Sequence, residues 1–311
     1  MGKAEDNFFK LSEHVSYIAL PTNIGLISVP SKDGSTKIYL IDSGNDSEIG
    51  RILLEFIESK FNKARLVAII NTHSHADHCG ANEYLKEKTG CQIWASRGEA
   101  ALMEFPELET SLIWGGAAIK DLRTKYFLAD SCHTDKKFLN NDTLTIEGIQ
   151  IKVFSLPGHY LDQTGFLISD TDGKKSCFLG DAISGRNVIK KYWIQYLLNE
   201  RKTKESLQKI SKIKADFYIP GHGNMVKEIE GLAELNILAL LETENLILEE
   251  LNSPRTTEEI LKSVADRNDI QLKLSQYVLI KSTLRAYLSS LFDEGKISYT
   301  IENNILHWVK L

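Results

Sequence analysis

The sequence predicts an α/β protein, an αββα sandwich in which two β-sheets pack together under helices, followed by a small C-terminal domain. Strand-like segments come first and then alternate with helical ones, the element order of two packed sheets with helices outside. Histidines and aspartates recur directly after apolar strand-like runs. Beyond Gly223 the composition changes to helical segments rich in leucine and isoleucine. We therefore expect one domain over residues 1–226 and a linker helix with a second domain over 227–311.

The first 61 residues predict three strands and a helix. Strand-like runs cover 15–19, 24–29 and 37–41, and turn residues such as Pro21 and Gly34 separate them. A helix is expected over 46–61, because apolar side chains recur at the spacing of one helical face, at Ile49, Ile52, Leu53, Phe56 and Ile57.

Strands and helices then alternate up to residue 219. The apolar, β-branched run 66–71 predicts a buried strand, and the segment after Gly80 predicts a helix that stops near Gly90. Other strands are expected over 92–95, 143–147, 150–155, 164–169, 176–179 and 217–219, and helices over 99–105, 112–119 and 197–213.

The C-terminal segment predicts helices followed by a hairpin. Pro254 ends a long apolar helix, and Asn303-Asn304 is a turn pair that tolerates left-handed dihedrals. Helices are expected over 227–251, from Thr256 or Thr257 onward, and over 275–292, with hairpin strands over 296–301 and 305–309. Helix, helix and hairpin are the outline of a winged helix.

Composition and charge set limits on the function. The hydrophobic fraction of 42% and charged fraction of 25% are typical of a globular protein. No apolar run approaches the ~18 residues of a membrane span, and no apolar signal region follows the first seven residues. The four cysteines lack paired spacing, which favours reduced thiols and a cytoplasmic location. A net charge of −5 gives no general attraction to nucleic acid.

A cluster of metal-ligand types lies in the segment 72–80, Thr-His-Ser-His-Ala-Asp-His-Cys-Gly. His73, His75 and His78 fall within six residues, with Asp77 between the last two. The cluster lies between the strand 66–71 and a helix, where a short loop directs side chains into one small volume. Imidazole and carboxylate are the usual ligands of zinc and similar divalent metals. The segment therefore predicts a metal site.

Four further residues stand in the same context. His159, Asp181 and His222 each follow a strand-like run next to a glycine, and Asp42 follows the third strand. Adjacent glycines let the backbone turn sharply and leave room for a metal ion and a substrate. We expect all these side chains to project from the same ends of the strands and to meet the histidine cluster.

The segment His73-Ser74-His75-Ala76-Asp77-His78, with the later His159, Asp181 and His222, resembles the metallo-β-lactamase-fold hydrolase superfamily over roughly residues 13–225. That resemblance implies one metal held by His73, His75 and His159 and a second held by Asp77, His78 and His222, with Asp181 bridging them. It also implies that Asp42 supports the site without binding metal.

The chemistry that follows is hydrolysis by a hydroxide shared between two divalent metal ions. We expect Zn²⁺, with iron or manganese as alternatives. Asp77 is expected to orient the nucleophile as well as bind metal. Tyr160, directly after His159, is the candidate general acid.

The substrate is expected to be a small-molecule ester, thioester or lactone. The lack of an export signal disfavours an antibiotic lactamase, and the 40 residues between Asp181 and His222 leave no room for the inserted domain of RNA-processing nucleases. Tyr160 stands where the glyoxalase II pattern has threonine, which disfavours a glyoxalase II assignment. The rival interpretations are a single-strand endoribonuclease, a sulfur dioxygenase with one iron held by His73, His159 and Asp181, and a non-enzymatic binding role for the C-terminal domain.

The predicted winged helix resembles the tail of the β-lactamase-like protein 2 family, whose animal members are single-strand-specific endoribonucleases. The charges disfavour nucleic acid, because residues 251–311 hold eight basic and seven acidic side chains, a balance of only +1. In the expected helix over 275–292, Lys281 and Arg285 are the basic residues, few for phosphate contacts. We expect this domain to cover the active-site mouth or to form a homodimer contact.

Overall fold

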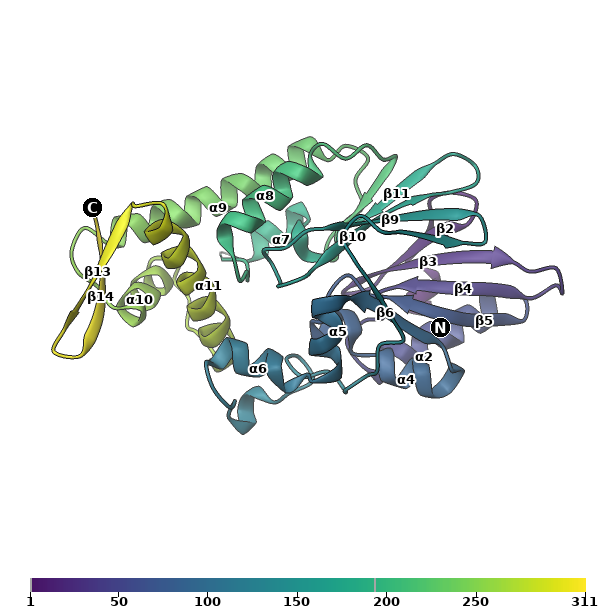
Figure 1. Cartoon of the computed structure of the whole chain (residues 1–311), viewed down its shortest axis with the longest axis horizontal. Helices are drawn as coiled ribbons and strands as arrows, with labels where there is room; N and C mark the ends of the chain where they lie inside the picture. Colours follow the sequence, from purple (N-terminus) through teal and green to yellow (C-terminus); the bar gives the residue numbers. More distant parts are fainter. Residues whose placement is uncertain (1, 193) are drawn as a thin grey trace.

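The protein is described by a computed structural model over residues 2–192 and 194–311. Two β-sheets pack face to face with helices on their outer faces, and further helices and a hairpin extend from one end (Figure 1). This arrangement confirms the predicted αββα sandwich. The first sheet consists of β1 (Phe8–Lys10), β2 (Val15–Ala19), β3 (Asn23–Pro30), β4 (Thr36–Ile41), β5 (Ala64–Ile70), β6 (Gln92–Ser96) and β7 (Lys136–Phe138).

The first sheet runs in sequence order from β1 to β7. Strands β1 to β4 are antiparallel neighbours, whereas β4 to β7 are parallel and need crossover segments between them. The crossovers carry α2 (Ser47–Lys60), α3 (Ala76–Cys79), α4 (Asn82–Thr89), α5 (Arg97–Glu104) and α6 (Glu107–Trp114).

The second sheet runs in the order β12-β11-β10-β9-β8. Its strands are β8 (Thr143–Ile146), β9 (Ile149–Ser155), β10 (Thr164–Ser169), β11 (Lys175–Phe178) and β12 (Phe217–Ile219). Strands β8 to β11 are antiparallel, and β12 pairs parallel to β11 after the crossover through α7 (Arg186–Lys191) and α8 (Glu200–Ile210).

Strand alternation sorts the apolar side chains into separate layers. In β4, Ile41 packs between the two sheets, whereas Leu40 faces the outer layer of α2 and α4. In β5, likewise, Ile70 packs between the two sheets and Ile69 faces the outer helices. Burial on both faces explains why these strands appear in the sequence as continuous apolar runs.

The C-terminal region contains three helices and a hairpin within the described residues. They are α9 (Glu230–Glu250), α10 (Thr257–Arg267), α11 (Leu274–Asp293), β13 (Ile297–Glu302) and β14 (Ile305–Lys310). One apolar cluster extends from Leu207 in α8 through Leu240 in α9 to Leu284 in α11. The helices and hairpin agree with the predicted element order, while the winged-helix identity and the boundary at residues 226/227 stay predictions.

The remaining differences from the sequence-based expectations are local. The strands β1 and β7 have three residues each and lack an alternating pattern, so they were not expected. The helix expected over 112–119 is α6, which begins after Pro106 and ends at Gly115, a residue in left-handed conformation (φ 84°). No helix in the described residues is long and apolar enough to cross a membrane.

A buried carboxylate ties the two sheets together. Asp170, directly after β10, accepts hydrogen bonds from the Ser12 hydroxyl (2.6 Å) and the His14 backbone N–H (2.8 Å) in the loop between β1 and β2. Burial opposes ionisation of Asp170, but these hydrogen bonds outweigh it and lower its pKa to about 2. The charged form is therefore stabilised in the folded protein.

We predict that Asp170→Ala lowers the free energy of unfolding by about 2 kcal/mol at neutral pH. Because the folded-state pKa is depressed, this stabilisation is present above the unfolded pKa and is lost as pH falls from about 4 towards 2. Urea unfolding followed by circular dichroism at several pH values measures it. The exposed neighbour variant Asp172→Ala is the control, and an equal loss in both variants would contradict the prediction.

Candidate metal centre

The predicted ligands come from separate strand ends that meet at one edge of the sandwich. His73 follows β5, His159 follows β9, Asp181 follows β11 and His222 follows β12. The structure brings all of them to the histidine cluster, so the expectation that they converge is confirmed. Their ligating atoms form three groups within 4.8 Å: His73, His75 and His159; His73, His78 and Asp181; and Asp77, His78 and His222.

The first group consists of three imidazoles. His75 Nδ1 lies 3.1 Å from His73 Nε2 and 3.0 Å from His159 Nε2. Burial holds the pKa of His73 and His75 well below its usual range and also lowers the pKa of His159. Neutral imidazole is the form that binds a metal ion, so these side chains are in the protonation state that a divalent cation needs.

The second group combines carboxylates with imidazoles. His222 Nε2 lies 3.0 Å from Asp77 Oδ2 and 3.3 Å from Asp181 Oδ2. Asp181 also lies 3.3 Å from His78 Nε2 and 3.7 Å from His159 Nε2, so it stands between the two groups. This central position matches the bridging role that the sequence predicts for Asp181.

The charges of this group favour a cation. Burial opposes ionisation of Asp181, yet His222 and His78 hold its pKa well below the usual range. Asp181 raises the pKa of His222 to about 12 against burial, and burial of His78 is outweighed by Asp181 and Asp77, which raise its pKa to about 10. Without a metal ion the carboxylates retain protons on their histidine partners, and a divalent cation would replace those protons.

The ring nitrogens that face away from the centre are anchored. His78 Nδ1 donates to Asp42 Oδ2 at 2.8 Å, and His73 Nδ1 lies 3.0 Å from the Thr72 hydroxyl, which itself donates to Asp42. Asp42 has φ of 63°, a conformation that costs energy in a non-glycine residue. The strained residue therefore fixes the orientation of a ligand histidine, in the position that the sequence predicts for a supporting carboxylate.

The other two strand-end histidines are held by backbone carbonyls. His159 Nδ1 donates to the Tyr196 carbonyl at 3.0 Å, and His222 Nδ1 donates to the Pro21 carbonyl at 2.7 Å. His78 Nε2 and Asp181 Oδ1, by contrast, are buried and face each other at 3.3 Å without forming a hydrogen bond. Anchored outer nitrogens with unpartnered atoms on the inner side are what a metal centre requires, so the residues fit two divalent ions.

Sequence reasoning missed a buried glutamate beside His75. Glu109 in α6 lies 3.2 Å from His75 Nε2 and accepts a hydrogen bond of 2.7 Å from the Tyr160 hydroxyl. Burial raises the pKa of Glu109 to about 8. Nothing in the local sequence distinguishes this residue from the other acidic side chains of an amphipathic helix.

Tyr160 is buried rather than exposed to the cavity. Its hydroxyl donates to Glu109, and burial, reinforced by that carboxylate, raises the pKa of the phenol well above its usual range. Both effects disfavour proton transfer to a substrate. The geometry gives the predicted general-acid role of Tyr160 no support, and instead connects Tyr160 to His75 through Glu109.

Sequence reasoning also missed Glu99, a carboxylate that holds the loop carrying the histidine cluster. Glu99 accepts hydrogen bonds from the Ser74 backbone N–H (2.9 Å) and hydroxyl (2.7 Å), and from the Asp162 N–H (2.8 Å). Burial raises its pKa to about 7. Glu99 therefore links the histidine cluster to the loop that follows His159.

The lack of a side chain at Gly221 leaves space for the candidate ligands. A Cβ atom at Gly221 would lie 2.1 Å from Asp181 Oδ1 and 2.8 Å from His78 Cε1. The backbone there is fixed from both sides, since Gly221 N–H donates to the Gly180 carbonyl and its own carbonyl accepts from Asn23 N–H. Any larger residue at position 221 would displace a ligand.

A family model of the metallo-beta-lactamase superfamily matches residues 17–222, which include every candidate ligand. This chain belongs to the metallo-beta-lactamase superfamily. It is 28% identical over 171 residues to hydroxyacylglutathione hydrolase GloC of Haemophilus influenzae, a match covering 55% of this chain and 71% of that protein. It is 26% identical over 223 residues to the beta-lactamase-like protein 2 homolog of Drosophila melanogaster, covering 70% and 64%.

Other matches are shorter or concern the fold. The hydroxyacylglutathione hydrolase of Hyphomonas neptunium is 30% identical over 115 residues, which span 37% of this chain and only 33% of that protein. A beta-lactamase domain protein from Burkholderia ambifaria superposes with a TM-score of 0.75 at 18% identity, over 98% of this chain and 94% of that one. The fold likeness therefore includes the C-terminal region beyond the family match.

A cavity of about 890 Å³ opens above the metallo-beta-lactamase ligands. His75, Asp77, His159, Asp181 and His222 form part of its lining. The C-terminal region supplies another part through Leu240 of α9 and, from α11, Gln276, Leu279, Ile280 and Thr283. Helix α11 thus borders the active-site cavity, in line with the expectation that this region covers the mouth.

Proposed function

We propose that this chain is a dinuclear metal-dependent hydrolase that cleaves a thioester of a small molecule. The observation that supports this most is the convergence of imidazole and carboxylate atoms within 4.8 Å at the floor of a cavity. The names of the Hyphomonas and Haemophilus relatives denote hydrolysis of hydroxyacylglutathione, a thioester. That favours a thioester over an ester or lactone.

We assign one ion to His73, His75 and His159, a second to Asp77, His78 and His222, and the position between them to Asp181. Divalent ions bound there would lower the pKa of a water molecule and polarise the substrate carbonyl. Nitrogen and oxygen ligands of this kind suit Zn²⁺.

The chain's own residues orient the reactants. Burial opposes ionisation of Asp77, but His78 and the hydrogen bond with His222 hold its pKa below the usual range, so it faces the cavity as an anion. An anionic carboxylate accepts a hydrogen bond from the attacking water and aligns it with the carbonyl carbon. The water oxygen then forms the new C–O bond and the C–S bond breaks, which yields a carboxylate, a thiol and a released proton.

A thioester substrate also agrees with the finding that Tyr160 is poorly placed to donate a proton. A thiol has an ordinary pKa near 8.5, so its thiolate leaves without a strong acid, whereas an alkoxide does not. Tyr160 and Glu109 then position His75 rather than donate a proton to the leaving group.

The decisive experiment measures metal content and substrate range together. Protein purified without added metal should contain two zinc ions per chain and should hydrolyse thioesters faster than esters, lactones or single-stranded RNA in one panel. One iron per chain with oxygen uptake on persulfides would contradict the proposal and favour a sulfur dioxygenase. Cleavage of RNA alone would favour an endoribonuclease.

We further propose a cytoplasmic location. The four cysteines are buried and unpaired, which is compatible with a reducing compartment. They are Cys79, Cys91, Cys132 and Cys177.

A further inference from the structure

The cavity above the metal-binding residues extends well beyond them. Besides the candidate ligands, its lining includes residues of α6, α7, α8, α9, α11 and the segment before β7. A volume of about 890 Å³ lies near the upper end of the range for small-molecule sites. A substrate that only filled the space next to the ligands would leave most of this cavity unused.

Much of the cavity wall is aliphatic. Ile183, Ile194 and Leu197 line it from the segments around α7, and Leu240 and Ile280 line it from α9 and α11. Each of these five side chains is less than a tenth exposed. They belong to one packed apolar cluster that reaches the cavity, and they offer a ligand nothing to pair with a charge.

Three polar side chains of the lining are already hydrogen-bonded to the chain itself. Asn236 accepts from the Ser184 N–H (2.9 Å) and donates to the Leu232 carbonyl (2.8 Å). The Thr283 hydroxyl accepts from the Leu197 N–H (3.4 Å), and Gln276 accepts from the Lys273 N–H (3.1 Å). Since these groups are engaged, the wall is less polar than its composition indicates.

The charges of the lining disfavour an anionic acyl group. Among the described lining residues, Lys191 is the one lysine or arginine, and it belongs to the exposed end of α7. The carboxylates of Asp77, Asp181 and Glu109 also line the cavity. An acyl group in the cavity therefore meets no cluster of cationic side chains.

We propose that the substrate's acyl group is bulky and apolar, as in a medium-chain fatty acyl thioester, and that it lies between the ligand residues and the wall formed by α9 and α11. This inference rests on the thioester hydrolysis proposed above and specifies its substrate class. The thiol portion then lies toward Lys191 and the open side of the cavity.

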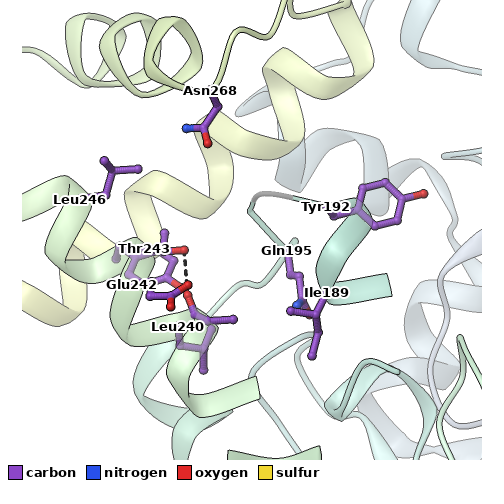
Figure 2. Close-up of a pocket in the computed structure, with 10 residues that line it drawn as sticks. Ile189, Tyr192, Gln195, Leu240, Glu242, Thr243, Leu246 and Asn268 are labelled. Carbon is purple, nitrogen blue, oxygen red and sulfur yellow. Dashed lines mark hydrogen bonds between the residues drawn. The ribbon is translucent and has the colours of Figure 1, made fainter. Parts of the chain in front are cut away.

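A smaller adjoining cavity limits the apolar region. It has a volume of about 320 Å³ and shares Tyr192, Gln195 and Leu240 with the active-site cavity (Figure 2). Beyond Leu240 its lining includes the polar side chains of Glu242 and Asn268. We therefore place the acyl group in the larger cavity alone.

The test compares acyl chain lengths on one thiol. The metal-loaded protein is assayed with S-acetyl, S-hexanoyl and S-decanoyl N-acetylcysteamine, and binding of the uncleavable S-ethyl and S-decyl thioethers is measured by calorimetry. Each methylene buried against the wall should raise kcat/KM roughly three- to fourfold. From acetyl to hexanoyl, kcat/KM should therefore rise about a hundredfold. The S-decyl thioether should bind at least a hundredfold more tightly than the S-ethyl thioether.

A pair of matched variants locates the effect on the wall. Ile280→Trp places a large side chain in the cavity, whereas Ser289→Trp makes the same change at an exposed position of α11. In Ile280→Trp the ratio of decanoyl to acetyl kcat/KM should fall at least tenfold, and binding of the S-decyl thioether should weaken by a similar factor. Ser289→Trp should keep both values of the unmodified chain.

The possible outcomes distinguish the inferred apolar acyl group from the proposed thioester hydrolysis. Thioester hydrolysis that does not increase with chain length, or S-decyl and S-ethyl thioethers that bind equally, would overturn the inference and leave the hydrolase intact. Failure to cleave any thioester with two metal ions bound would overturn the proposed function. Thioether binding, which needs no turnover, would then decide the apolar site by itself.

Discussion

Replacing Asp181 by alanine should lower kcat/KM for thioester hydrolysis by about a thousandfold or more and leave at most one metal ion per chain. Its carboxylate lies between His78, His159 and His222, at 3.3 to 3.7 Å from their Nε2 atoms. Without it, three imidazoles that neighbour one another lose the negative charge between them. Elemental analysis of the purified variant and steady-state kinetics measure the two losses.

The matched control for this variant is Asp293→Ala. Asp293 is an exposed aspartate at the end of α11, remote in sequence from every candidate ligand. It should retain two metal ions and the activity of the unmodified chain. If Asp181→Ala bound two ions and kept its kcat/KM within threefold, the proposed bridging position would be wrong.

Gly221→Ala should be nearly as damaging although it adds a single methyl group. The new Cβ would lie 2.1 Å from Asp181 Oδ1, closer than any non-bonded contact, and two backbone hydrogen bonds prevent the loop from moving away. We expect loss of at least one metal ion and a fall in kcat/KM of about a hundredfold, with a loss of about 1–3 kcal/mol in stability. Metal analysis, kinetics and urea unfolding check these values.

Gly116→Ala provides the comparison. A Cβ atom at Gly116 meets nothing within 4 Å, and its backbone is not among those with positive φ. This variant should match the unmodified chain in metal content, activity and stability. A Gly221→Ala protein that behaved in the same way would show that the loop can open, contrary to the geometry.

Most of the sandwich was predictable because its strands are buried on both faces. Residues 66–71 formed a continuous apolar run in the sequence, and the structure places β5 there with side chains in two separate layers. The short strands β1 and β7 were not predictable, since three residues carry no period of their own and pair only because a neighbouring strand is available.

The convergence of the ligands was predictable for a similar reason. Each of His159, Asp181 and His222 directly follows a strand and stands beside a glycine, and strand ends of packed sheets meet at an edge. Glu109 and Glu99 carried no such signal. Both lie in helices among other polar residues, and only tertiary packing turns them inward to His75 and Ser74.

The predicted boundaries of α6 were wrong, and this error affected the prediction of the site. The apolar spacing favoured residues 112–119, yet Pro106 and Gly115 set the ends of the helix at 107 and 114. This shift of a turn or more places Glu109 within the helix and beside His75. An error in helix boundaries thus concealed a residue of the site.

Two different parts of the chain line the cavity, and this has a consequence for protein engineering. Residues up to 222 supply the candidate ligands, whereas α9 and α11, outside the family match, supply another part of the cavity lining. A randomised library confined to positions such as Leu279 and Ile280 would therefore retarget selectivity while every metal-binding side chain stays native.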